Sequence, residues 1–140
     1  MKRVALFLAV AAGACLGSGE PTAVRVQTNA TEYMSAAPGE ALRVRFAVAN
    51  LTDRSILVSR CGDHVNPAVD RWVNGAWINF GSAMCPANQL SVPLLLGPRA
   101  AYEDSTVLST SGVFQLRLGT SGAPAQAMTW TLVSNRFQVH

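Results

Sequence analysis

The chain has 140 residues, a formal net charge of +3 and 49% hydrophobic residues, a length that suits one domain with its own core. Without Lys2 and Arg3, which lie in the N-terminal leader, nine arginines stand against eight acidic residues, a net charge of about +1. A domain this close to neutral lacks the basic patch of nucleic-acid-binding proteins, so we expect no nucleic-acid partner.

The first segment of the chain predicts export. Lys2 and Arg3 precede the apolar run VALFLAVAAGA, which extends from Val4 to Ala14 and ends in small residues. A basic start, a short apolar run and a small-residue exit are typical of a secretory signal peptide. The run is shorter than the roughly 20 residues of a membrane-spanning helix, so we expect no permanent transmembrane anchor.

The end of this leader carries a second signal. Ala12, Gly13 and Ala14 directly precede Cys15 and resemble the lipobox of bacterial lipoproteins, although Leu is commoner than Ala12 at its position. The AGA triplet also fits ordinary signal cleavage, which would leave Cys15 as an odd thiol. The resemblance implies a lipoprotein signal peptide over residues 1–14 and acyl chains, such as palmitate, on Cys15. It also implies a tether over residues 15–21 that holds the protein at a membrane surface of the bacterial cell envelope.

Residues 22–140 are expected to form one all-β domain. Apolar residues alternate with polar ones in short runs, and turn residues separate the runs about every 8 to 12 positions, as in an antiparallel β-sandwich. In EALRVRFAVANLTD, one face carries Leu42, Val44, Phe46 and Val48 and the other carries Arg43, Arg45 and Ala47. The predicted strands in chain order are TAVRVQT with Val24 and Val26 inward, this run, SILVS, a hairpin from Val69 to Phe80, LSVPLLL, AYEDSTVL, GVFQLRLG, MTWTLVS and RFQVH. Pro93 confines its run to a sheet edge or a bulge.

Several of these runs resemble immunoglobulin-like domains of bacterial envelope proteins. VRFAVANLTDRSILVS is similar to their B and C strands, LLLGPRAAYEDSTVL and SGVFQLRL to their E and F strands, and SNRFQV to their G strand. The resemblance implies an immunoglobulin-like antiparallel β-sandwich of seven to nine strands. The layout is also similar to intracellular proteinase-inhibitor domains, which share a hairpin of this kind. Phe114 departs from the Tyr that many such domains carry in strand F.

The stretch WVNGAW predicts a tight hairpin. Asn74 and Gly75 suit a type I′ turn, which places Trp72 opposite Trp77 in a non-hydrogen-bonded pair. Such an aromatic pair contributes about 0.5–1 kcal/mol. The two tryptophans serve either the core and the hairpin itself or, together with Asn74 and Arg71, a surface that contacts a protein or glycan partner of the envelope.

Two cysteines remain once Cys15 is lipidated. Cys61 and Cys85 in an exported domain predict a disulfide, which stabilises by roughly 3–3.5 kcal/mol for a loop of this length. The alternative is a copper or zinc site made of Cys61, His64, Met84 and Cys85, whose soft ligands suit these metals. The domain body contains no second His, and adjacent strand residues such as Met84 and Cys85 point to opposite faces. We therefore expect no bound metal.

Two N-x-[ST] sequons begin at Asn29 and Asn50. Both lie where turns favour Asn. We interpret Asn50 as a turn residue.

The sequence contains no recognised catalytic motif: G-x-S-x-G, HExxH and a Gly-rich phosphate loop are all missing. A nucleophile pair of Cys61 and His64 would need a reduced thiol, which export disfavours. Glu103 and Asp104 are neighbours on a predicted strand and are expected to lie on a solvated edge. We therefore expect a lipoprotein that is not an enzyme, has no cofactor and acts as a binding or assembly module. A proteinase-inhibitor-like domain and a periplasmic copper- or zinc-binding protein are the alternatives.

Overall fold

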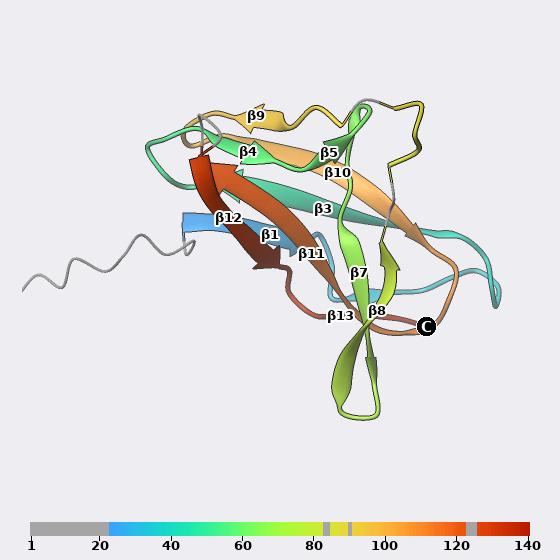
Figure 1. Ribbon diagram of the computed structural model, residues 1–140. Coiled ribbons are helices and arrows are strands. Elements are labelled where there is room, and N and C mark those ends of the chain that lie inside the picture. The colour runs from blue at the N-terminus through green and yellow to red at the C-terminus, as the bar shows by residue number, and fades with distance from the viewer. Residues whose placement is uncertain (1–22, 83–84, 90, 123–125) are drawn as a thin grey trace, which may run out of the picture.

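The computed structural model describes residues 23–82, 85–89, 91–122 and 126–140, whose course Figure 1 shows. These residues form strands and turns without an α-helix, which confirms the all-β fold class. Accordingly, none of them belongs to a helix long and apolar enough to cross a bilayer. The predicted leader over 1–14, Cys15 and the tether to residue 21 lie outside the described residues.

The strands form two main sheets and a short ribbon. The first sheet has the antiparallel order β1 (Val24–Thr28), β3 (Leu42–Asn50) and β10 (Ala101–Leu108). The second sheet has the order β2 (Glu32–Tyr33), β13 (Phe137–Val139), β11 (Gly112–Gly122), β4 (Ile56–Val58) and β9 (Leu94–Leu96). β11 also pairs with β12 (Gln126–Val133) and with β7 (Ala68–Val73), whose hairpin partner is β8 (Ala76–Ser82). The ribbon consists of β5 (Arg60–Cys61) and β6 (His64–Val65).

This strand order is that of an immunoglobulin-like sandwich. β3 and β10 take the places of strands B and E in one sheet, whereas β4, β11 and β13 take those of strands C, F and G in the other. The predicted fold is therefore confirmed. The parallel pairing of β2 with β13 is an addition to the antiparallel pattern.

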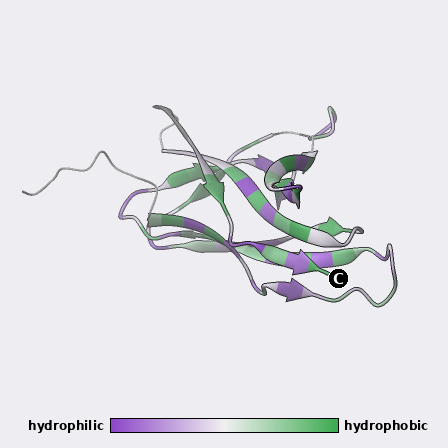
Figure 2. Ribbon diagram, turned by 90° about the horizontal axis from the view of Figure 1, so that it is seen from below, coloured by the Kyte–Doolittle hydropathy of each residue, from purple (hydrophilic) through white to green (hydrophobic). Residues whose placement is uncertain are grey.

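The core lies between the inner faces of the two sheets. Val44, Phe46 and Val48 of β3 are buried while Arg43 and Arg45 are exposed, as their alternation predicts. Figure 2 shows the same alternation of hydrophobic and hydrophilic residues along the strands. The facing sheet contributes the fully buried side chains Phe114, Leu116, Leu118 and Phe137.

Each predicted run contains a strand, but three short strands, β2, β5 and β6, were not predicted. β4 and β7 both pair with β11, and the chain between them leaves the sheet to form the ribbon of β5 and β6. β12 and β13 also both pair with β11 and are separated at Ser134. Leu116 N donates to Ser134 Oγ at 2.8 Å, and Ser134 N donates to Leu116 O at 2.9 Å. The backbone N–H and C=O of Leu116 therefore both have a partner between β12 and β13. β9 is an edge strand directly after Pro93, as predicted.

Asn50 fixes the turn between β3 and β4. Its side chain is fully buried, and Nδ2 donates to the carbonyl oxygens of Arg54 (2.8 Å), Leu96 (3.2 Å) and Gly97 (2.8 Å). Oδ1 accepts from both the backbone N (3.1 Å) and Oγ1 (2.7 Å) of Thr52. Asn50 is therefore the turn residue that the sequence predicts, and it also connects this turn to the end of β9.

Candidate functional site

The hairpin of β7 and β8 has the predicted turn and register. Asn74 and Gly75 have φ values of 50° and 86°, as a type I′ turn requires, and Trp72 pairs with Trp77. Figure 1 shows that the hairpin extends beyond the body of the sandwich, and Asn74 is exposed at its tip.

Trp72 and Trp77 lie on the outer side of the hairpin. Their ring centroids are 5.1 Å apart with an angle of 64° between the planes, an edge-to-face contact. Trp72 is 37% exposed, and neither ring belongs to the buried core. The Arg136 guanidinium, from the segment between β12 and β13, lies 5.3 Å from the centroid of each ring. We call Trp72, Trp77 and Arg136 the tryptophan face.

A shallow hollow adjoins the tryptophan face. It has a volume of about 310 Å³ and includes Trp72, Arg136 and the carboxylate-bearing Glu32 in its wall. Its other lining residues are Thr31, Val113, Phe137 and Gln138. An aromatic ring therefore stands beside a cation, an anion, a hydroxyl and an amide, the combination of apolar surface and few polar groups that small-ligand sites use.

Arg71, which the sequence groups with Trp72 and Trp77, does not lie beside them. Its guanidinium lies 5.6 Å from the ring centroid of Phe80 and 5.9 Å from that of Phe114, and Nη2 donates to Ser111 O at 2.8 Å. Neighbouring residues of a strand point to opposite sides, so Arg71 extends the core side of the hairpin while Trp72 points outward.

The position of Arg136 beside the tryptophans is not predictable from the neighbouring sequence. Arg136 is distant from the hairpin in sequence, and nothing in the stretch SNRFQV distinguishes it from an ordinary exposed arginine. Its position follows from two sheet pairings, because β11 places Phe114 opposite both Arg71 and Phe137. Only this alignment through β11 could have placed Arg136 next to the tryptophans.

Cys61 and Cys85 form the predicted disulfide, with their Cα atoms 5.4 Å apart. It joins β5 to the loop after β8, and Gln89 Oε1 contacts Cys61 Sγ at 3.2 Å. The disulfide leaves no thiolate for the alternative copper or zinc site, and Met84 of that set lies outside the described residues. Within the described ranges, no group of three or more His, Cys, Asp or Glu is placed to hold a metal ion.

Asp104 does not lie on a solvated edge, which corrects the prediction for it. Its side chain is 7% exposed and accepts hydrogen bonds from Val65 N at 2.7 Å and Ser105 N at 2.8 Å. His64 Nδ1 lies 3.2 Å from Asp104 Oδ1. Glu103, its neighbour, is exposed. Asp104 therefore connects the ribbon of β5 and β6 to β10 of the first sheet.

Replacing Asp104 by alanine should lower the free energy of unfolding by about 1–2 kcal/mol, because the buried Val65 N would lose its acceptor. Urea denaturation followed by circular dichroism measures the change. Glu103→Ala, one residue away and exposed, serves as the matched control with an expected effect within about 0.5 kcal/mol. Equal effects of the two variants would contradict the assigned role of Asp104.

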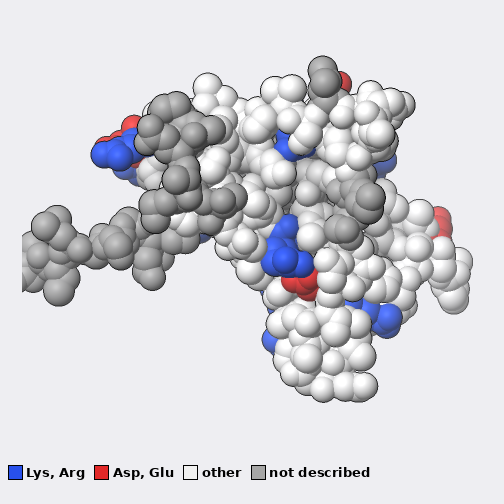
Figure 3. Space-filling model, in the orientation of Figure 1, with Lys and Arg blue, Asp and Glu red and all other residues white. Residues whose placement is uncertain are grey.

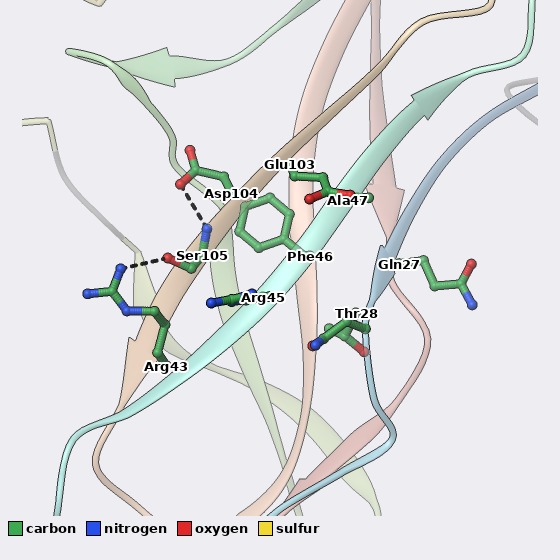
Figure 4. Close-up of a pocket in the computed structure, with 10 residues that line it drawn as sticks. Gln27, Thr28, Arg43, Arg45, Phe46, Ala47, Glu103, Asp104 and Ser105 are labelled. Carbon is green, nitrogen blue, oxygen red and sulfur yellow. Dashed lines mark hydrogen bonds between the residues drawn. The ribbon is translucent and has the colours of Figure 1, made fainter.

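A second hollow, of about 590 Å³, lies over the sheet of β1, β3 and β10 (Figure 4). Arg43, Arg45 and Glu103 line it, and Arg43 Nη1 donates to Ser105 Oγ at 3.4 Å. Both signs of charge meet here, and Phe46, the aromatic residue that lines the hollow, is only 2% exposed because it belongs to the core. The tryptophan face therefore has the more distinctive chemistry for recognition.

Comparisons with known proteins give structural neighbours only. A scan of protein-family models finds no match, and a search of curated proteins finds none either. Among solved structures, the chain is similar to a target of the Northeast Structural Genomics Consortium with a TM-score of 0.45, 17% identity and 83% of each chain covered. It is also similar to the ASH or PapD-like domain 7 of human CEP192, with a TM-score of 0.44, 14% identity and coverage of 99% of this chain and 94% of that one.

Proposed function

We propose that the protein is a non-catalytic binding or assembly module of the bacterial cell envelope, anchored through acyl chains on Cys15, and that it binds an envelope glycan or protein through the tryptophan face. One observation carries the proposal: two adjacent indole rings point away from the core on a projecting hairpin, with the Arg136 guanidinium over both of them.

Outward-facing tryptophans support recognition because a partner that covers their large rings removes a large apolar surface from water. Clusters of exposed aromatic residues with Arg are the features that dominate binding energy in interfaces. The Arg136 guanidinium holds the rings in place and leaves a positive charge beside them. A sugar ring or an extended peptide with an acidic group matches this combination of flat apolar surface and cation.

Several other polar groups of the described residues have structural contacts. Arg117 Nε and Nη2 each donate to a carboxylate oxygen of the buried Asp70 at 3.0 Å, and this contact raises the pKa of Arg117. Asp104 holds the ribbon, and the two cysteines are oxidised. With these groups engaged, binding is the function that the remaining exposed chemistry favours.

Titration of intrinsic fluorescence tests the tryptophan face. The chain has three tryptophans, so a Trp72→Phe/Trp77→Phe variant leaves Trp130 as the reporter. Soluble peptidoglycan fragments and envelope proteins should change the emission of the parent protein in a saturable way and leave that of the variant unchanged. An equal response of parent and variant would contradict the proposal. Stoichiometric inhibition of a protease would instead favour the inhibitor-like alternative.

The anchor is tested separately from the binding face. Cys15→Ser should abolish incorporation of labelled palmitate in the producing bacterium and move the protein from the membrane fraction to the soluble fraction. Ser18→Ala is the matched control, since it changes the same tether without touching the lipidated residue. Palmitate incorporation into the Cys15→Ser variant would contradict the lipid anchor.

A further inference from the structure

The outer edge of β8 has no partner strand among the described residues, and the ladder to β7 is regular from Ala76 to Asn79, before a register shift leaves Phe80 between the paired residues Asn79 and Gly81. Within the part of the chain that the structure describes, β8 pairs with β7 alone. Its stretch AWINFGS contains no charged residue and no proline, the features that usually protect a sheet edge. Ile78 and Phe80 on this strand are 46% and 41% exposed. A bare edge of this kind is a template for pairing with another strand.

The hairpin register determines which backbone groups the edge offers. The two-residue turn makes Val73 and Ala76 a hydrogen-bonded pair, and hydrogen-bonded pairs alternate along an antiparallel ladder. Ile78 therefore bonds to β7, whereas the N–H and C=O groups of Trp77 and Asn79 point away from it. The free edge thus offers two donors and two acceptors, arranged evenly about Ile78.

We propose that β8 pairs antiparallel with β8 of a second copy of this chain, with the two-fold axis at Ile78. In this register the backbone N–H and C=O of Trp77 bond to those of Asn79 of the partner subunit. The backbone of Asn79 bonds in the same way to Trp77 of the partner subunit. Ile78 faces Ile78 of the partner subunit in a non-hydrogen-bonded pair, where side chains approach most closely. Ala76 then faces Phe80 of the partner subunit.

A second copy fits this edge because the edge is complementary to itself. Antiparallel self-pairing brings Ala76, Ile78 and Phe80 onto one side, all apolar, so no like charges meet. The hairpin extends beyond the sandwich in Figure 1, and its projecting part is almost entirely uncharged in Figure 3. Two hairpins can therefore lie side by side while the charged bodies stay apart.

The dimer goes beyond the proposed function because it joins two tryptophan faces. The two-fold axis of this pairing is perpendicular to the plane of the sheet, so equivalent faces of the two copies lie on the same side of the joined sheet. Trp72 and Trp77 of both copies would then form one continuous aromatic surface. A partner with repeated units could bind both copies at once, which strengthens binding through effective concentration.

Cysteine cross-linking tests the register directly. In the Cys15→Ser chain, Ile78→Cys should form an intermolecular disulfide under mild oxidation, because a non-hydrogen-bonded pair places Cα atoms about 4.5 Å apart, within disulfide range. Val107→Cys is the matched control, since Val107 is 56% exposed on β10. Mass spectrometry should find the Ile78→Cys peptide linked to itself. Equal cross-linking of both variants would overturn the proposed register.

Sedimentation tests the association itself. The Cys15→Ser chain should sediment as a concentration-dependent dimer, and Ile78→Lys should weaken it at least roughly tenfold by placing two lysines at the axis. Val107→Lys should leave the dimer unchanged, and circular dichroism confirms that both variants are folded. A purely monomeric parent, or a dimer that Ile78→Lys does not weaken, would overturn the proposal. Trp72→Ala should impair partner binding and keep the dimer, so the two proposals can fail separately.

Discussion

Replacing Asn50 by alanine is expected to lower the free energy of unfolding by about 3 kcal/mol, because the buried amide satisfies several backbone groups at once. The carbonyl oxygens of Arg54, Leu96 and Gly97 would lose their shared donor, and Thr52 N would lose its acceptor. Water cannot easily replace the amide in a fully buried position. Urea denaturation at neutral pH measures the loss.

Two further variants separate this role from a simple loss of volume. Asn50→Asp keeps an acceptor for Thr52 and places a buried carboxylate against three carbonyl oxygens, so it should destabilise at least as much as alanine. Asn88→Ala removes an exposed turn residue and should change stability by less than about 0.5 kcal/mol. Similar stabilities of Asn50→Ala and Asn88→Ala would show that the Asn50 contacts contribute little.

Removing the disulfide should have an effect of similar size. The free energy of unfolding of a Cys61→Ser/Cys85→Ser double variant should fall by about 3 kcal/mol. The disulfide links residues that are 24 positions apart, and without it the unfolded chain gains conformational entropy. The bridge also holds the loop after β8 against β5, whose partner strand β6 is tied to Asp104. Thermal and urea denaturation of the oxidised parent and the double variant give the difference.

Reduction of the parent protein is the matched experiment, since it opens the same loop without substituting a residue. Reduced parent and double variant should have equal stabilities, both well below that of the oxidised parent. A double variant that unfolds at the same denaturant concentration as the oxidised parent would contradict a stabilising role for this disulfide.

The sequence predicted the elements whose causes are local. Alternation in β3 identified its buried face, and Asn74-Gly75 predicted both the turn and the pairing of Trp72 with Trp77. Cys61 and Cys85, together with the export that the leader predicts, indicated the disulfide. The buried face and the turn depend on residues that are neighbours in the sequence, and the disulfide follows from the number of cysteines. None of these three predictions requires the tertiary arrangement.

The contacts between distant segments could not be predicted in this way. Arg136 reaches the tryptophans because β11 aligns β7 with β13, and Asp104 bonds to Val65 of the ribbon of β5 and β6, which the sequence did not predict. Arg71 was grouped with Trp72 from sequence proximity, although strand geometry separates them. The direction in which the tryptophans face likewise depends on which side of the second sheet meets the first.

The binding of the unlipidated Cys15→Ser chain to purified envelope material, compared with that of a Trp72→Ala/Trp77→Ala variant, tests the tryptophan face most directly. Trp130→Phe controls for the loss of an indole elsewhere in the protein. We predict saturable binding by the parent and the Trp130→Phe control, and binding at least roughly tenfold weaker for the double variant, as removal of two interface aromatics implies. Equal binding by the parent and the double variant, with both folded, would contradict a recognition role for this face.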